Sequence, residues 1–490
     1  MSADARFSRF LDRFPDYAAT GHLDELRRRD YARLDHAGQI YLDYTGAALY
    51  GESQVRQHLA LLEQGVFGNP HSANPASLSM TGHVESTRRA VLDFFGAGDD
   101  YLLVFTPNAT GALKLVGESF PFSPASRFLA TSDNHNSVNG IREFARRAGA
   151  GITYCPLTES ELRLDPLWLS AELDRRPAAA ESLFALPAQS NYSGVKHDLT
   201  WVTTARRRGW RVLLDAAAFV PTNRLDLQRV APDFLSISFY KMFGYPAGVG
   251  ALLVRKETLS LLDRPWFAGG TVNFTTVKRL SHVLSAGEAA FEDGTVNYLS
   301  IPAVRIGLEH LAAIGMETIG TRVRCLSGWL LEDLHQLKHA NGKPFVKLHG
   351  PATTEARGGT ITFNLYDPFG ARIDYRRIEE LAGLTGISLR TGCFCNPGAN
   401  EAAEGLTDED IALGQTLGND WNLPNFVRLL EANRLGRGSG AIRASIGLAS
   451  NFTDVARLVD FLRPLLDQPR AAIGQVSVSD DTCRVIRDSA

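Results

Sequence analysis

The sequence has few cysteines, little net charge and no long apolar run. Five cysteines in 490 residues, an odd number, argue against a disulfide framework and for a reducing compartment, so we expect a cytoplasmic protein. With a net charge of −3, the chain has no overall positive potential that would attract nucleic acid or an anionic membrane. No apolar run reaches the roughly 20 residues of a membrane span. The polar N-terminus also lacks the apolar centre of a signal peptide.

Metal-ligand patterns are also missing. Cys393 and Cys395 are separated by one residue, and no second such pair or group of histidines stands at zinc-ligand spacing, so we predict no metal site. The composition, 44% hydrophobic and 21% charged, is ordinary for a globular protein. The length suits one large two-part unit or two to three domains.

The sequence does contain a repeated alternation of apolar strand and amphipathic helix. The predicted strands are residues 101–105, 127–130, 182–186, 210–215, 235–241 and 249–254. This alternation predicts an α/β fold with a mostly parallel sheet sandwiched by helices. Because such sheets bind ligands beyond the carboxyl ends of their strands, we expect the polar residues at those ends to share one site.

Two neighbouring strand ends carry a lysine and an aspartate. Lys241 ends one apolar run, where burial lowers a lysine pKa and a neutral lysine can form a Schiff base with an aldehyde. Asp215 ends the run before it. A pyridoxal 5′-phosphate site uses such a pair, the lysine on the aldehyde and the aspartate on the pyridine nitrogen. Taken alone, Lys241 is more often a lysine that reaches solvent, and the pair with Asp215 favours the cofactor.

Three motifs stand at these positions and farther along the chain. They are Asp215-Ala-Ala-Ala-Phe-Val, Ser238-Phe-Tyr-Lys241 and Arg390-Thr-Gly-Cys-Phe-Cys395-Asn-Pro-Gly. In combination they resemble class V pyridoxal-phosphate enzymes of fold type I, and above all the cysteine-desulfurase-like domain of molybdenum cofactor sulfurase. The resemblance runs from about Tyr41 to about Leu462. Ala218 and Tyr240 differ from the glutamine and histidine of ordinary cysteine desulfurases, as in the molybdenum cofactor sulfurase branch.

The resemblance implies a phosphate site at a strand-to-helix turn. The turn is Asn108-Ala109-Thr110-Gly111, whose backbone N–H groups suit a phosphate. Thr110, Ser238 and backbone amides, including that of Ala109, would be the donors. Without the resemblance, such a turn is equally an ordinary helix cap.

Other site residues follow from the same resemblance. His135 would stack on the pyridine ring and shuttle protons, although a lone histidine is as often structural. Asn191 would bond near the phenolic oxygen of the ring and contact the substrate. Arg443 would form a fork on the substrate carboxylate, which suits its guanidinium geometry.

A Gly294-Thr295 turn predicts a dimer. In the resembled family this turn reaches the cofactor phosphate of a partner subunit, which implies a homodimer with composite sites. Taken alone, such a Gly-Thr turn is an ordinary surface turn with no functional role.

The nucleophile expected from the resemblance is Cys395. It lies with Cys393 in a glycine- and proline-rich stretch, where a mobile loop would let a thiol reach substrate sulfur and deliver it elsewhere. Arg390 could favour its thiolate form. The implied activity is a cysteine desulfurase that takes sulfur from L-cysteine as a persulfide on Cys395, releases alanine and serves a sulfur-acceptor protein.

Alternative functions stay open at this point. A selenocysteine lyase, a C–S lyase on a cysteine-derived metabolite, and a class V aminotransferase or epimerase are the rivals, and the last does not need Cys395. The chain ends near the close of the resembled part, so we expect no second domain for molybdopterin. The stretch 396–440 is longer than in ordinary desulfurases and is expected to be a functional or disordered loop.

The expected organisation has three parts. Residues 46–300 would form a large cofactor-binding domain, and residues 1–45 with 301–467 a smaller α+β domain. Residues 468–490 would be a polar, loosely held tail.

Overall fold

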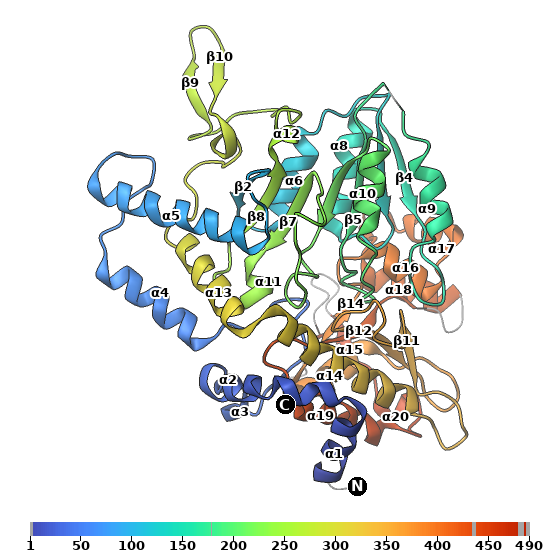
Figure 1. Cartoon of the computed structure of the whole chain (residues 1–490). Coiled ribbons are helices and arrows are strands. Elements are labelled where there is room, and N and C mark those ends of the chain that lie inside the picture. Colours follow the sequence, from blue (N-terminus) through green and yellow to red (C-terminus); the bar gives the residue numbers. More distant parts are fainter. Residues whose placement is uncertain (1–2, 178, 434–437, 479–484, 487–490) are drawn as a thin grey trace.

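Seven strands form the central sheet of the computed structural model, which describes residues 3–177, 179–433, 438–478 and 485–486 (Figure 1). They are β2 (Tyr101–Thr106), β3 (Arg127–Thr131), β4 (Gly151–Cys155), β5 (Leu183–Pro187), β6 (Arg211–Asp215), β7 (Phe234–Ser238) and β8 (Gly250–Arg255). Their order is β2-β8-β7-β6-β5-β3-β4, and β8 runs antiparallel to both neighbours. The strands from β7 to β4 are parallel, which confirms the predicted α/β class.

The central sheet is covered on both faces. Leu214 and Leu235 belong to one apolar core, and Leu213 and Phe234 belong to another. Adjacent residues of a strand point to opposite faces, so a strand with both faces covered is apolar throughout. The covering helices include α6 (Ala109–Ser119), α7 (Asn136–Asn139), α8 (Ile141–Arg147), α9 (Pro166–Leu173), α10 (Thr200–Arg207) and α12 (Lys256–Leu259).

A second, antiparallel sheet has the order β11-β12-β15-β14. Its strands are β11 (Val346–His349), β12 (Thr360–Leu365), β15 (Ala441–Ser445) and β14 (Arg390–Gly392). The helices beside it are α14 (Met316–Gln336), α15 (Tyr375–Leu384), α19 (Phe452–Leu462), η4 (Arg463–Leu465) and α20 (Arg470–Ile473). Nearby, β1 (Ile40–Tyr41) pairs with β13 (Ile387–Ser388), so the N-terminal segment joins this smaller part.

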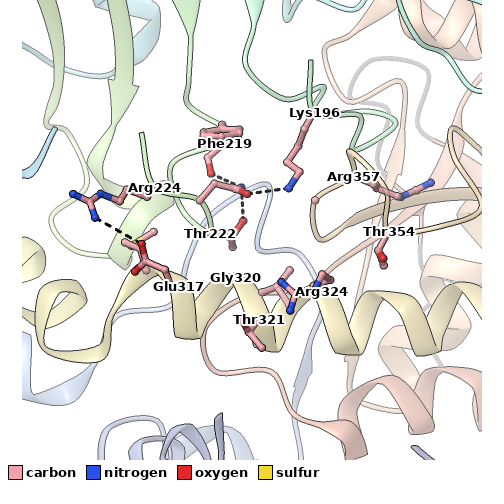
Figure 2. Close-up of a pocket in the computed structure, with 14 residues that line it drawn as sticks. Lys196, Phe219, Thr222, Arg224, Glu317, Gly320, Thr321, Arg324, Thr354 and Arg357 are labelled. Carbon is pink, nitrogen blue, oxygen red and sulfur yellow. Dashed lines mark hydrogen bonds and ion pairs between the residues drawn. The ribbon is translucent and has the colours of Figure 1, made fainter. Parts of the chain in front are cut away.

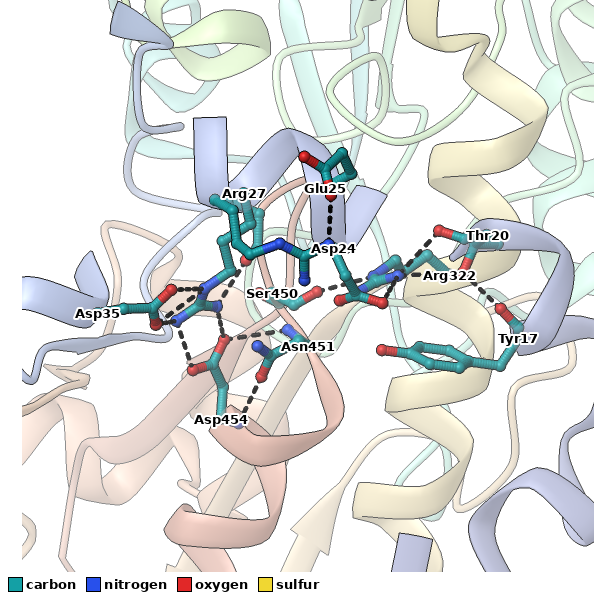
Figure 3. Close-up of polar contacts among 12 residues, drawn as sticks. Tyr17, Thr20, Asp24, Glu25, Arg27, Asp35, Arg322, Ser450, Asn451 and Asp454 are labelled. Atoms are coloured by element: carbon teal, nitrogen blue, oxygen red, sulfur yellow. Dashed lines mark hydrogen bonds and ion pairs between the residues drawn. The ribbon is translucent and has the colours of Figure 1, made fainter. Parts of the chain in front are cut away.

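The N-terminal helices are fastened to the smaller part by buried ion pairs (Figure 3). These elements are α1 (Ala3–Arg13), η1 (Pro15–Thr20), α2 (His22–Asp30) and α3 (Arg33–His36). Arg27 donates to the buried Asp454 of α19 at 2.5 Å, and also to the half-exposed Asp35 of its own segment at 2.7 Å. Arg322 of α14 donates to Ser450 O at 2.9 Å and pairs with Asp24. Because removing one partner of a buried pair leaves a buried charge, these contacts fix the N-terminal segment.

A hairpin of β9 (Val272–Thr276) and β10 (Ser281–Leu284) projects from the body of the molecule (Figure 1). Four apolar residues of this hairpin are exposed: Phe274, Val277, Leu280 and Val283. After the hairpin, the chain continues through η2 (Gly287–Ala290) to α13 (Ile301–Ile314), which packs against α5 (Pro75–Phe94) and α4 (Glu52–Gln64). None of the described helices is long and apolar enough to cross a bilayer.

Several elements differ from the sequence prediction. The stretch 396–440 contains α16 (Pro397–Glu404), α17 (Asp408–Gln415), η3 (Gly418–Asp420) and α18 (Leu423–Asn433) where a long loop was expected. The cause is local, since Thr407 and Asp410 form a capping box that starts α17. Residues 434–437, including Gly436, lie outside the described residues. Strand β4 was not predicted, and the tail contains the short pair β16 (Ser477–Val478) and β17 (Val485–Ile486).

Candidate active site

Lys241 lies in α11 (Phe239–Phe243), a single turn of helix that directly follows β7. The turn after β1 packs against it, because Ala48 N donates to Tyr240 O at 3.2 Å. Gly244 ends α11 with φ 81°, and a Cβ there would lie 2.2 Å from Tyr50 N, so only glycine allows this approach. Gly244, three residues after Lys241, therefore lets the chain hold the lysine at the end of the strand.

Burial lowers the pKa of Lys241, and the nearby Arg443 cation lowers it further. The carboxylate of Asp215 is the largest opposing influence, followed by the thiol of Cys395. No hydrogen bond to Lys241 Nζ occurs within the described part of the chain. A lysine with a lowered pKa has more of the neutral amine that attacks a carbonyl.

Asp215 ends β6, which pairs in parallel with β7, as the sequence predicted. Its Oδ1 accepts from Ala217 N at 3.0 Å and from Ser236 Oγ at 3.1 Å. The residue is 9% exposed. Two donors on one oxygen fix the carboxylate at the end of the strand, and Oδ2 accepts no hydrogen bond from the described residues.

His135 caps α7, and its ring nitrogen Nδ1 accepts from Ser137 N at 3.1 Å. Nδ1 is therefore unprotonated, and Nε2 carries the hydrogen. Burial lowers the pKa of His135, Lys241 lowers it as well, and Asp215 raises it. A neutral histidine beside Lys241 and Asp215 can offer its ring face and one N–H.

The turn predicted to hold a phosphate is the N-terminus of α6. Ala109 N donates to Ser238 Oγ at 2.9 Å, so the first turn of this helix touches the end of β7. Thr110 Oγ1 and Ser137 Oγ are 2.7 Å apart, which joins this turn to the turn of His135. Hydroxyl groups at a helix N-terminus suit a phosphate. With the lysine, the aspartate and the histidine, these donors fit pyridoxal phosphate.

The two cysteines lie in a tight turn between β14 and α16. Phe394 and Cys395 have φ 56° and 54°, a left-handed conformation that is uncommon outside glycine and marks local strain. The structure thus has a short turn where a mobile glycine- and proline-rich loop was expected, because Pro397 and the glycine after it belong to the first turn of α16.

Hydrogen bonds from the segments that follow β3 and β5 of the central sheet hold this turn. Asn136 N donates to Cys395 O at 2.7 Å, and Asn191 Nδ2 donates to Phe394 O at 2.8 Å. Asn396 Nδ2 donates to Asn191 Oδ1 at 2.8 Å. Cys395 is thereby tied to the residue that follows His135. Both ends of the Asn191 amide are engaged by the turn, a contact that the sequence did not reveal.

The two cysteines meet different surroundings. Cys395 is exposed and influences the pKa values of Lys241 and Arg443. Cys393 is half-buried and instead raises the pKa values of Tyr192 and Tyr375. Of the two cysteines, therefore, it is Cys395 whose charge acts on Lys241.

Arg443, in β15, is 3% exposed and belongs to the same centre. Its Nη1 donates to Asn191 O at 3.0 Å and its Nη2 to Asp43 Oδ1 at 2.9 Å. The ring of Phe394 lies 4.7 Å from its guanidinium carbon. Burial lowers the pKa of Arg443, and Asp43 raises it. Sequence reasoning missed Asp43 and Phe394 as members of the site, although an acid at the end of a strand was a visible signal.

Two other residues singled out from the sequence, Arg390 and Thr295, have hydrogen-bond partners within this chain. Arg390 was expected to favour the Cys395 thiolate, but its Nε and Nη2 donate to Asp43 Oδ2 at 3.0 and 2.7 Å. Thr295 accepts from Asn69 Nδ2 at 3.3 Å and lines a 380 Å³ cavity beside α6. It is not among the groups that influence the pKa of Lys241.

A separate cavity of 360 Å³ lies where loops of the central sheet meet α14 (Figure 2). We call it the seam cavity. Its lining includes Lys196, Asn223, Glu317, Arg324 and Arg357, and none of the predicted site residues. Lys196 Nζ donates to Asn223 Oδ1 at 3.3 Å. Within the described ranges, no group of His, Cys, Asp and Glu could hold a metal ion.

Comparisons with known proteins give a family and a fold. A family model described as aminotransferase class-V matches residues 40–458. The molybdenum cofactor sulfurase of Arabidopsis thaliana is 35% identical over 516 aligned residues, which cover 96% of this chain and 62% of the relative. The chain thus spans about half to three fifths of the length of the curated relatives it matches.

Solved structures share the fold. The apo structure of a cysteine desulfurase from Thermococcus onnurineus NA1 superposes with a TM-score of 0.74 at 21% identity, covering 90% of this chain and 97% of that one. A cystine C–S lyase, C-DES, in complex with its product cysteine persulfide, has a TM-score of 0.65 at 18% identity, covering 87% and 98%. The architecture is therefore the one found in these enzymes.

Proposed function

Because the chain belongs to the class-V aminotransferase family, we propose that it is a pyridoxal 5′-phosphate-dependent cysteine desulfurase of the molybdenum cofactor sulfurase type. One observation carries the proposal. Cys395 is held by Asn136 next to His135, in the same centre as Lys241 and Arg443. A thiol beside a lysine with a lowered pKa and a carboxylate-binding arginine suits sulfur abstraction from an amino acid.

The residues present would hold the cofactor in a defined way. Lys241 would bind its aldehyde, Asp215 its ring nitrogen, and His135 one face of its ring. The donors for its phosphate would be Ala109, Thr110 and Ser238. When bound, pyridoxal phosphate supplies an electron sink for the α-carbon of the substrate.

The chain's own groups would then carry out the transfer. Arg443 binds and orients L-cysteine, Asn191 supports Arg443 through its backbone O, and Lys241 moves a proton from the Cα of the substrate. The Cys395 thiolate attacks the substrate sulfur, so that an S–S bond forms and the Cβ–S bond breaks. Cβ gains a proton, alanine leaves, and a persulfide remains on Cys395.

Delivery of the sulfur is the next step of the proposal. Cys395 is exposed, which suits a handover to an acceptor. The curated relatives are named molybdenum cofactor sulfurase, so that cofactor is the first acceptor to test, followed by a sulfur-acceptor protein.

We further propose a homodimer in the cytoplasm. The exposed apolar hairpin β9–β10 is a surface that a second copy could cover, and Thr295 on the segment after it would reach the phosphate of the partner. None of the four cysteines in the described ranges is in a disulfide, which suits a reducing compartment. Sedimentation tests the dimer: a fully active monomer would contradict it.

The domain boundaries are also a proposal. Residues 46–300 would form the cofactor-binding part, and 1–45 with 301–467 the smaller part, with 468–490 as a tail. The pairing of β1 with β13 supports the assignment of the N-terminal segment.

A C–S lyase is the second candidate. This candidate is favoured by the fold shared with the cystine C–S lyase C-DES. Such a lyase would eliminate sulfur from its substrate without forming a persulfide on the protein. The deciding experiment measures alanine and sulfide release from cysteine, selenocysteine and cystine, together with mass spectrometry of the peptide with Cys393 and Cys395. Added sulfur on Cys395 supports the desulfurase. Full turnover without it supports the lyase, and transamination alone supports an aminotransferase.

A further inference from the structure

Two arginines of the site stand directly opposite one another. Arg390 of β14 and Arg443 of β15 are register partners in an antiparallel pair. Like charges in such positions repel, and burial of Arg443 strengthens the effect. The pair therefore needs an anion between its members.

Asp43 is that anion. Its Oδ1 accepts from Arg443 Nη2 at 2.9 Å, and its Oδ2 accepts from Arg390 Nε and Nη2 at 3.0 and 2.7 Å. The residue is 7% exposed. Arginine–carboxylate bonds of this length are among the strong hydrogen bonds of proteins, so Asp43 joins the two strands at the site.

The turn after Asp43 is shaped around these contacts. A Cβ at Gly46 would lie 2.7 and 2.8 Å from the two oxygens of Asp43 and 2.8 Å from Arg390 Nη2. Any other residue would push the carboxylate or the guanidinium aside. Tyr41 supports the turn from below, with its hydroxyl donating to Ala47 O at 2.9 Å.

The hydrogen bonds of Arg443 to described residues use two of its five N–H donors. One hydrogen of Nη1 goes to Asn191 O, one of Nη2 goes to Asp43, and the ring of Phe394 covers the guanidinium face. The Nε of Arg443 is buried and has no partner within the described ranges. Buried N–H groups of arginine are seldom left unpaired, and a carboxylate is the acceptor that a guanidinium prefers.

We infer that Asp43 is the positioning residue for recognition of the substrate carboxylate. It fixes Arg443 so that Nε–H faces the site, and through Arg390 it holds the strand that leads to Cys395. This inference rests on the proposed function only in taking an α-amino acid as the ligand. Without Asp43, the two arginines repel and Arg443 loses its orientation.

The test compares substrates with and without a carboxylate. With the full chain and bound cofactor, Asp43→Asn is expected to raise the KM for L-cysteine by about tenfold to a hundredfold, with a smaller change in kcat. The KM for cysteamine, which has the same amine and thiol but no carboxylate, is expected to stay unchanged. Asp43→Glu retains the charge and should recover part of the loss.

Asp35→Asn is the matched control. It also removes a 2.7 Å arginine contact, that of Arg27, but lies away from the site. It should leave the ratio of the two KM values as it is. An unchanged KM for L-cysteine in Asp43→Asn, or equal losses on both substrates, would overturn the inference.

A binding measurement separates this inference from the proposed function. If the wild-type protein releases no alanine from L-cysteine, the desulfurase proposal fails, but calorimetry with L-alanine and ethylamine still tests Asp43. Weaker L-alanine binding by Asp43→Asn, with ethylamine unchanged, supports the inference. Equal L-alanine affinity, or none in the wild type, overturns it. If Asp43→Asn does not fold, Asp43→Glu is measured in its place, with a smaller shift in the same direction expected.

Discussion

Burial lowers the pKa of two lysines in the described part of the chain, Lys241 in the candidate active site and Lys196 in the seam cavity. Around Lys241 stand a carboxylate, a thiol, a histidine and an arginine, each on a different element. Around Lys196, in the seam cavity, the contact is an amide oxygen of Asn223, and the other charge that shifts its pKa is the cation of Arg324 (Figure 2). A lowered lysine pKa therefore does not define an active site. The convergence of groups with different chemistry does.

The largest expected effect comes from removing the first lysine. Lys241→Ala should reduce turnover by roughly 10⁵-fold or more, since the amine both binds the cofactor and moves the proton. Borohydride should no longer trap the cofactor on the protein, as judged by absorbance and mass spectrometry. Trapping that persists in the variant would point to another lysine, with Lys196 the first to examine.

The second-largest effect is expected from removing the thiol of Cys395. No cysteine is among the described residues that line the seam cavity. Cys395→Ala should reduce sulfur transfer from L-cysteine by about 10⁴-fold while cofactor binding stays intact. Cys393→Ala is the matched control on the same turn. It should slow transfer less, because Cys395, and not Cys393, is among the largest influences on the pKa values of Lys241 and Arg443. The readouts are alanine release and the persulfide mass on each variant. A larger loss in Cys393→Ala would exchange the roles of the two residues.

A smaller effect is expected at Phe394, which links the thiol turn to Arg443. Phe394→Leu keeps most of the apolar volume but removes the aromatic face 4.7 Å from the guanidinium. Such a contact contributes about 0.5–2 kcal/mol, so kcat/KM for L-cysteine should fall by about tenfold. Measurement with cysteamine should give a smaller loss. Equal losses would mean that Phe394 only supports the fold.

The smallest effect is expected in the seam cavity. Lys196→Gln should leave alanine release within twofold of wild type. The pKa of Lys196 is lowered below 10.5 in the folded chain, so the unfolded chain holds this proton more tightly and stability rises with pH as the native lysine titrates. The variant should lose that rise, with unfolding followed by denaturant at several pH values up to 10.5. A large loss of turnover would make the seam cavity part of the site.

Local patterns in the sequence were enough to predict much of the fold. The strand ends at Asp215 and Lys241 are neighbours as expected, since apolar strands in α/β order have few arrangements. Helices α17 and α18 were missed because the length of the stretch 396–440 was given more weight than the capping box at Thr407.

Contacts between distant segments could not be predicted in the same way. Asp43 meets Arg443 across 400 positions, and no periodicity or spacing rule relates such residues. The direction of the two cysteines also depends on the left-handed turn at Phe394, which sequence patterns do not favour for an aromatic residue. The chemistry of the site was thus visible, while its supporting contacts were not.

The long span between Asp43 and Arg443 has a consequence for biosynthesis. A ribosome releases the central sheet, complete at Arg255, long before it makes Arg443, and domains generally fold as units during synthesis. The growing chain can therefore seat Lys241 among its strands while Asp43 and the N-terminal helices still lack their partners. Arg27 likewise waits for Asp454, 427 positions later. Recognition of an amino acid is thus among the last properties that a newly made molecule acquires, and an interrupted chain would emerge without it.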